Sequence, residues 1–173
     1  MDISNYSLLD IQRGLEKVYD DITTGKYTYD NPKAFILGGQ SGAGKTTLHK
    51  IFFDHYLGNI VIINADDYRR FHPHYDDIYI QYGNEAANYT QSIANAIANA
   101  LVEKLSDEGF NIVVEGTCRR ADVPLKACRD LKEKGYIVEL SVMCTSEEIS
   151  WQSTIDRYNE MAKIEGMLPR AVP

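Results

Sequence analysis

The sequence lacks the features that would direct it to a membrane, a secretory route or nucleic acid. No apolar stretch approaches the roughly 18 residues that a transmembrane helix needs. Residues 1–5 lack the basic and apolar regions of a signal peptide. Lys and Arg number 18 against 25 Asp and Glu, so the formal net charge of −7 provides no basic footprint for nucleic acid. We therefore expect a cytoplasmic protein with neither a membrane nor a nucleic acid as partner.

Cysteine is scarce, which argues against a disulfide framework and against a cysteine-based metal site. Cys118, Cys128 and Cys144 are odd in number and do not have metal-ligand spacing. Reduced, mostly structural thiols are expected, as in a cytoplasmic protein. At 173 residues, of which 44% are hydrophobic, the chain fits one domain with its own core.

Local patterns predict helices and strands that alternate along the chain. Apolar residues three and four apart predict helices, and short β-branched or aromatic runs predict buried strands. This order predicts an α/β fold with a central, mainly parallel sheet flanked by helices. The expected helices cover residues 8–22, 46–53, 93–108, 122–135 and 145–164, and the expected strands cover 34–37, 59–63, 111–115 and 136–143.

Two further expectations concern a connecting segment and the core. The stretch from Tyr68 to about Tyr82 is polar and aromatic and is expected to be a loop. Its tyrosines either stack a sugar or base, or pack the loop onto the domain. Trp151 and the apolar stripe from Ile93 to Leu105 are assigned to the core.

One segment matches G-x-x-x-x-G-K-[ST], the phosphate-binding loop of P-loop NTPases. The expected strand 34–37 leads into it and an expected helix leaves it, and this context argues against a chance glycine-rich turn. Backbone N–H groups and the helix N-terminus would bind phosphate, Lys45 would reach the β- and γ-phosphates, and the Thr46 hydroxyl would ligate Mg²⁺. We therefore expect a nucleotide-kinase-like P-loop fold that binds ATP or GTP through Gly39, Gln40, Ser41, Gly42, Ala43, Gly44, Lys45, Thr46 and Thr47.

A carboxylate at the end of the second strand is the candidate general base. Asp66 and Asp67 follow strand 59–63, and ligands of parallel sheets bind beyond the carboxyl ends of the strands. A kinase that acts on a hydroxyl needs a carboxylate to orient it and accept its proton. Asp66 is the candidate for that role. The alternative is that the pair caps a short helix, with Asp67 as the better cap.

The end of the third strand carries a second carboxylate, Glu115, followed by Gly116 and Thr117. This rim should be the one that also carries Asp66 and the phosphate loop. The segment either holds substrate or a metal-bound water, or is a strand-to-loop turn with glycine at a special backbone angle.

Arginines would supply positive charge to phosphoryl transfer, which spreads negative charge over the equatorial oxygens. Arg157 and Arg170 lie on or after the last expected helix, where a lid over the nucleotide could form. For any single arginine, the alternative is a solvated surface charge or a weak ion pair.

Together these segments resemble the zeta-toxin family of bacterial toxin–antitoxin systems, especially its streptococcal type. The resemblance runs from about Pro32 to the C-terminus. The phosphate loop alone occurs in many families, whereas its combination with the other segments is more specific. The segments that carry the resemblance are residues 38–47, 62–69, 72–75, 115–117, 122–124, 157–158 and 169–173.

The resemblance implies a kinase that transfers the γ-phosphoryl group of ATP to the 3′-hydroxyl of the N-acetylglucosamine unit of UDP-N-acetylglucosamine. Such a product blocks early peptidoglycan synthesis and makes the kinase a toxin, and a small helical antitoxin is the implied partner and inhibitor. The implied catalytic residues are Asp66 as general base, with Lys45, Arg157 and Arg170 on the phosphates. The implied substrate-binding residues are Asp66, Arg69, Glu115, Thr117 and Arg119, and Thr46 is the implied Mg²⁺ ligand.

The chain also departs from the family pattern. Members usually continue well beyond the Pro-Arg-Ala-x-Pro segment, so we expect residues 1–173 to form one P-loop kinase domain that lacks C-terminal helices present in relatives. Asn64 stands where relatives commonly have Asp, and Cys118 and Arg120 vary the loop after Glu115. Two other functions remain open: a kinase of another small metabolite or antibiotic, and a catalytically impaired nucleotide-binding fragment.

Overall fold

A computed structural model describes residues 3–164 as an α/β arrangement of helices around one sheet. No helix in this range is both long and apolar enough to cross a bilayer. In chain order the elements are α1 (Leu8–Thr23), β1 (Lys33–Gly39), α2 (Lys45–His55), β2 (Val61–Asn64), the 3₁₀ helix η1 (Ala65–Phe71), α3 (Tyr75–Tyr82), the 3₁₀ turn η2 (Gly83–Glu85), α4 (Ala86–Glu108), β3 (Ile112–Gly116), α5 (Asp122–Glu133), β4 (Ile137–Met143) and α6 (Glu147–Ala162).

The four strands form one parallel sheet in the order β2-β3-β1-β4. Parallel neighbours cannot be joined by a tight hairpin, so a helix lies in every connection between consecutive strands. The predicted parallel sheet flanked by helices is confirmed. The register aligns Leu37 with Glu115 and Asn64 with Glu115, which places the carboxyl ends of β1, β2 and β3 on one rim.

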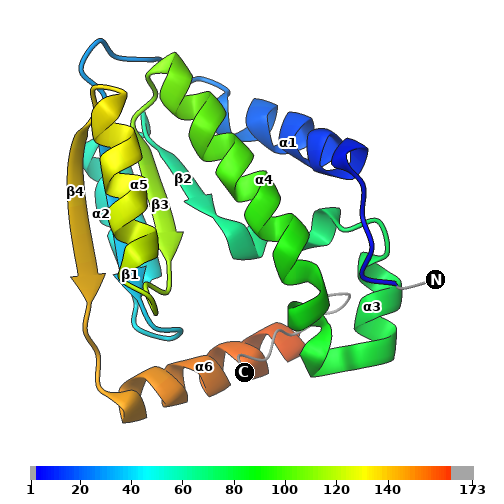
Figure 1. Ribbon diagram of the computed structural model, residues 1–173. Coiled ribbons are helices and arrows are strands. Elements are labelled where there is room, and N and C mark those ends of the chain that lie inside the picture. The colour runs from blue at the N-terminus through cyan, green and yellow to red at the C-terminus, as the bar shows by residue number, and fades with distance from the viewer. Residues whose placement is uncertain (1–2, 165–173) are drawn as a thin grey trace.

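Alternating side chains of the strands divide the core into two clusters. Ala34, Ile36 and Ile112 face α1, α4 and α5, and the stripe of α4 from Ile93 to Leu105 packs on them. This stripe is fully buried, as predicted. Figure 1 shows α4 and α5 on one face of the sheet and α2 on the other.

The second cluster lies between the sheet and α2. Phe35, Leu37 and Val113 point to this face, and Leu48 and Phe52 of α2 pack against them. The Phe35 and Phe52 rings are 4.5 Å apart between centroids. Because strand side chains alternate with period two, one sheet serves both clusters.

The predicted loop from Tyr68 to Tyr82 is wrong, because η1 and α3 occupy most of this stretch. The segment contains few strong helix formers, and helices this short are marginal on their own. Tertiary packing stabilises them here: Ile78 of α3 is fully buried and Tyr68 of η1 is nearly so. Burial against α4 and α1, rather than local propensity, makes the segment helical.

The assignment of Trp151 to the core is also wrong, since 61% of this residue is exposed. Trp151 lies on α6, whose buried residues are Ser150 and Thr154. In Figure 1, α6 runs beyond the carboxyl end of β4 rather than along a face of the sheet. Its inward side therefore meets the phosphate loop and not the apolar core.

Candidate phosphate-binding site

The loop between β1 and α2 has the backbone of a phosphate-binding turn. Gly42 and Gly44 have φ values of 75° and 87°, in the left-handed region where glycine carries little strain. A Cβ at Gly42 would lie 2.1 Å from the carbonyl oxygen of Ser150. The loop leads directly into the N-terminus of α2, where unpaired backbone N–H groups and the helix dipole favour an anion.

Lys45 folds back over this loop. The residue is 9% exposed, and its Nζ donates hydrogen bonds to the carbonyl oxygens of Gly39 at 2.8 Å and Gln40 at 2.9 Å. The same Nζ lies 3.6 Å from Glu115 Oε1. A buried ammonium bonded mainly to neutral carbonyls can exchange these partners for the stronger charge of a phosphate.

Thr46 is exposed in the first turn of α2, next to Lys45. A hydroxyl at this position is accessible to a hydrated divalent cation that also contacts bound phosphate. The residues present therefore fit the Mg²⁺ expected from the sequence, with Thr46 as the ligand that the protein would supply.

Among residues 3–164, Glu115 is the carboxylate that forms an ion pair with Lys45. Its side chain is 15% exposed at the end of β3, between Lys45 and a residue that the sequence did not point to, His49. The His49 Nε2 lies 2.7 Å from Glu115 Oε2. His49 is four residues after Lys45 on α2, so both side chains lie on one face of the helix, and that spacing could have identified it.

The residues after Glu115 turn outward. Thr117 and Arg119 are exposed. Cys118 between them has a φ of 52°, and its side chain lies against Gly38. Burial raises the pKa of the Cys118 thiol, which keeps it protonated. Thr117 and Arg119 therefore lie on the open side of the rim.

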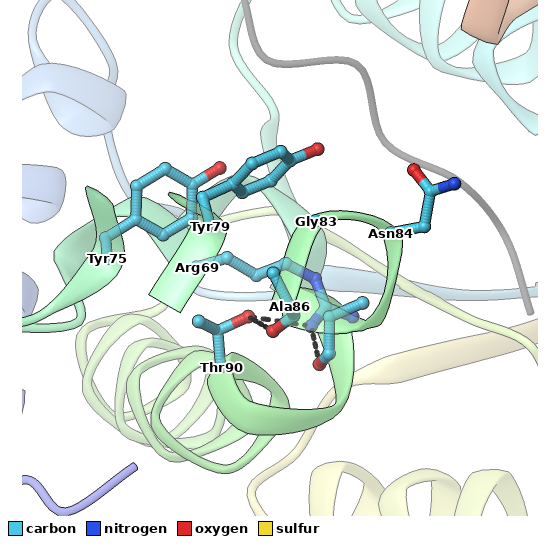
Figure 2. Close-up of a pocket in the computed structure, with 8 residues that line it drawn as sticks. Arg69, Tyr75, Tyr79, Gly83, Asn84, Ala86 and Thr90 are labelled. Atoms are coloured by element: carbon cyan, nitrogen blue, oxygen red, sulfur yellow. Dashed lines mark hydrogen bonds between the residues drawn. The ribbon is translucent and has the colours of Figure 1, made fainter. Parts of the chain in front are cut away.

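Asp66 lies in the first turn of η1 and is bound by Arg69. The Arg69 Nε and Nη2 donate to Asp66 Oδ1 at 2.9 and 2.7 Å. The other guanidinium bonds reach α4, with Nη1 donating to the Ala87 carbonyl oxygen at 2.6 Å and to Thr90 Oγ1 at 3.2 Å, and Nη2 donating to Gln91 Oε1. Figure 2 shows the Arg69 side chain next to Thr90 of α4. The Asp66 side chain itself is 51% exposed.

Asn64, which the sequence marked only as a departure from the family pattern, has a capping role that was not predicted. Its side-chain oxygen accepts a hydrogen bond from the Asp66 backbone N–H at 3.1 Å and caps η1. Asp67 is therefore not the cap, contrary to the alternative considered for the Asp pair. Asn64 is the last residue of β2, and cap-forming residues are common just before a helix.

Helix α6 and the residues just before it contact the phosphate loop on the side opposite α2. Ser150 Oγ donates to the Ser41 carbonyl oxygen, Thr145 Oγ1 donates to the Ala43 carbonyl oxygen, and Gln40 Nε2 donates to the Thr145 carbonyl oxygen. Arg157 follows Ser150 by seven residues, about two turns, and thus lies on the helix stripe that meets the loop. Its side chain is exposed.

The chain is similar to known proteins over most of its length. Residues 16–173 match the zeta toxin family. The chain belongs to this family. Toxin PezT of Streptococcus pneumoniae serotype 4 is 42% identical over 173 residues, which are 100% of this chain and 68% of that protein. Toxin zeta of Streptococcus pyogenes is 33% identical over 171 residues, 99% of this chain and 60% of that protein.

A solved structure supports the same relationship. The PezAT chromosomal toxin–antitoxin system of Streptococcus pneumoniae contains a chain that superposes with a TM-score of 0.89 at 42% identity, covering 95% of this chain and 68% of that one. The predicted zeta-toxin resemblance and the α/β fold are confirmed. This zeta-family chain thus spans 60–68% of the length of the two toxins named above.

The candidate site of this zeta-family chain comprises two groups of residues. Lys45, His49 and Glu115 form a partly buried cluster under the phosphate loop, and Asp66 is paired with Arg69 at the end of β2. Thr117, Arg119 and Arg157 are placed at exposed positions. Arg170 lies outside the described residues.

Proposed function

We propose that this chain is a phosphotransferase that moves the γ-phosphoryl group of ATP, with Mg²⁺, to the 3′-hydroxyl of the N-acetylglucosamine unit of UDP-N-acetylglucosamine. The observation that carries the proposal is the common rim of the sheet. There the glycine-rich loop with its buried lysine lies at the same edge of the sheet as Glu115, near the end of β3, and Asp66, just after β2. A phosphate donor and a hydroxyl acceptor need these groups side by side.

In the proposed reaction, the loop N–H groups and Lys45 bind the phosphates of the donor. Asp66 orients the acceptor hydroxyl and accepts its proton as the phosphoryl group transfers. Mg²⁺, held in part by Thr46, would neutralise the charge that develops on the phosphate oxygens. Arg157 contributes positive charge from α6, and the same role is proposed for Arg170.

The acceptor side would be formed by the rim beyond β3. Glu115, Thr117 and Arg119 are proposed to contact the sugar nucleotide, with Thr117 and Arg119 accessible from solvent. Arg69 was expected to bind substrate. Its guanidinium is buried and bonded to Asp66 and α4, which supports an orienting role toward Asp66 in addition.

We further propose that the activity makes the protein the toxin of a toxin–antitoxin pair in the cytoplasm. Family membership supports this role. A helical antitoxin that covers the nucleotide site would inhibit the kinase.

The first experiment is a transfer assay with ATP, Mg²⁺ and UDP-N-acetylglucosamine, followed by mass spectrometry of the sugar nucleotide. A gain of one phosphate on the sugar supports the proposal. ATP binding without product contradicts the assigned acceptor or indicates an impaired fragment, and a parallel screen of other small hydroxyl acceptors separates these two outcomes.

Two variants test the assigned roles. Asp66→Asn should bind nucleotide with near wild-type affinity while the transfer rate falls about 10²–10⁴-fold, which is the usual contribution of a general base. Lys45→Ala should lower both nucleotide affinity and transfer rate, because it removes charge stabilisation of the transferring group. Full transfer activity in Asp66→Asn would rule out this residue as the base.

A further inference from the structure

Glu115 lies between two side chains, those of Lys45 and His49, that approach different carboxylate oxygens. Lys45 Nζ is 3.6 Å from Oε1 and His49 Nε2 is 2.7 Å from Oε2, and all three side chains are at most 15% exposed. The His49 Nε2 is buried and, among the residues that the structure describes, forms no hydrogen bond of normal geometry. The contact is therefore short but not aligned as a hydrogen bond, and the ring and the carboxylate must reorient relative to each other to form one.

The Lys45 ammonium cannot stay close to the Glu115 carboxylate and also bind the phosphates of a nucleotide. In this structure its Nζ is bound to the carbonyls of Gly39 and Gln40 and lies near Glu115. A phosphate on the loop would attract the ammonium away from the carboxylate, since a P-loop lysine contacts the β- and γ-phosphates. A mostly buried carboxylate left without a partner is costly.

We propose that His49 is a positioning residue that takes over the Glu115 carboxylate when Lys45 turns to nucleotide phosphate. The Nε2–H of His49 then donates a straight hydrogen bond to Glu115. This bond frees Lys45 for the phosphates and keeps the Glu115 carboxylate in place at the rim of the sheet. This inference rests on the nucleotide-binding part of the proposed function and requires neither phosphoryl transfer nor a particular acceptor.

The test is a double-mutant cycle on nucleotide affinity, measured by calorimetric titration with MgADP. His49→Ala should weaken binding about tenfold, equivalent to about 1.4 kcal/mol, because releasing Lys45 would strand Glu115. In the Glu115→Gln background the same substitution should change affinity less than about twofold, since no charge is left to be stranded.

Two conservative variants show which nitrogen matters. Gln places its amide nitrogen at the position of the histidine Nε2, whereas Asn places it at the position of Nδ1. His49→Gln should therefore bind MgADP within about threefold of the wild type, and His49→Asn should resemble His49→Ala. His55→Ala, at an exposed position near the end of the same helix, is the matched control and should bind like the wild type.

Equal weakening by His49→Ala in both backgrounds would overturn the proposal, because His49 would then act through packing and not through Glu115. No weakening in the wild-type background would overturn it as well, and so would failure of the wild type to bind nucleotide. A protein that binds MgADP with the expected coupling and transfers no phosphate would retain this inference while contradicting the proposed reaction.

Discussion

Arg69 illustrates how a single side chain links the proposed catalytic carboxylate to the rest of the domain. Its side chain is 10% exposed, and the guanidinium is bonded on one side to Asp66 and on the other to Ala87, Thr90 and Gln91 of α4. The planar fork of arginine suits several acceptors in fixed directions, and lysine cannot reproduce it. Arg69 therefore fixes the orientation of Asp66 relative to α4, which belongs to the core.

We expect Arg69→Lys to lower the transfer rate about tenfold or more while the KM for ATP changes little, because a slightly misplaced base slows chemistry more than binding. The free energy of unfolding should fall by about 1–3 kcal/mol, since buried acceptors lose their donors. Steady-state kinetics and urea unfolding measure the two effects. Arg70→Lys, at the exposed neighbouring position, should change neither, and a similar loss there would contradict the assignment.

His72 connects η1 to the segment before α1. Its Nδ1 accepts a hydrogen bond from the His74 backbone N–H at 3.1 Å, so the proton sits on Nε2, which donates to the Ser4 carbonyl oxygen at 3.2 Å. Burial lowers the pKa of His72, and the nearby His74 lowers it further. The hydrogen bond to Ser4 and, to a smaller extent, the charge of Asp10 partly oppose this shift. The folded protein thus favours the neutral ring.

This pKa shift predicts a loss of stability in mild acid. The unfolded chain binds the proton near pH 6.5, whereas the folded chain resists it, so the free energy of unfolding is highest above about pH 6.5 and falls as the pH drops toward the folded-state pKa. The slope approaches about 1.4 kcal/mol per pH unit at most for one proton. Urea unfolding at pH 7.5, 6.5 and 5.5 measures it. His72→Asn, which does not titrate, should show a flatter profile, and parallel profiles would contradict the prediction.

Helices α2 and α6 hold the phosphate loop between them. The loop continues into α2 through Lys45, while Ser150 of α6 and Thr145 just before that helix donate hydrogen bonds to loop carbonyl oxygens at Ser41 and Ala43. At Gly42 the loop backbone lies so close to α6 that the Ser150 carbonyl occupies the space where a Cβ would lie. The shape of the loop thus depends on an element more than 100 residues further along the chain.

Gly42→Ala should therefore be more damaging than its backbone angle alone explains. A left-handed φ costs a non-glycine residue about 1–2 kcal/mol, and the added Cβ must also displace α6. We expect a lower thermal midpoint and weaker MgADP binding, measured by calorimetry. Gly25→Ala is the matched control, since Gly25 has a φ of 74° and a Cβ there would meet nothing within 4 Å. It should show only the backbone penalty, and equal losses in both variants would contradict the role of the α6 contact.

The two apolar clusters share one sheet, so the domain should unfold as a unit. Leu101 in α4 and Val113 in β3 are fully buried on opposite faces. Because β3 contributes side chains to both clusters, loss of one face removes support from the other.

Leu101→Ala should lower the free energy of unfolding by about 2–5 kcal/mol, as large-to-small core changes do. Far-ultraviolet circular dichroism and the fluorescence of Trp151 on α6 should report the same shifted midpoint, although Leu101 and Trp151 lie in different helices. Two separate transitions would show that α6 unfolds independently of the α4 face.

Much of the secondary structure could be predicted because its causes are local. The periodic stripe of α4 and the strand runs of β1, β3 and β4 contain their own patterning, and the structure confirms them within a few residues. The segment from Tyr68 to Tyr82 has no such pattern, and only burial of Ile78 against other elements makes it helical. The assignment of Trp151 to the core was wrong for a related reason: an aromatic residue does not indicate whether its helix packs on the sheet or lies beyond it.

The sequence alone identified the family and the position of the phosphate loop, because eight consecutive residues contain the glycines, the lysine and the hydroxyl that the loop requires. It also predicted that Asp66 and Glu115 share one rim of the sheet, and the structure places Asp66 just after β2 and Glu115 near the end of β3. The tertiary structure decided which side chains meet these carboxylates: Arg69 and α4 for Asp66, Lys45 and His49 for Glu115, and α6 over the loop. Those pairings depend on the strand order β2-β3-β1-β4, which comes from packing of the whole chain and not from any local run of residues.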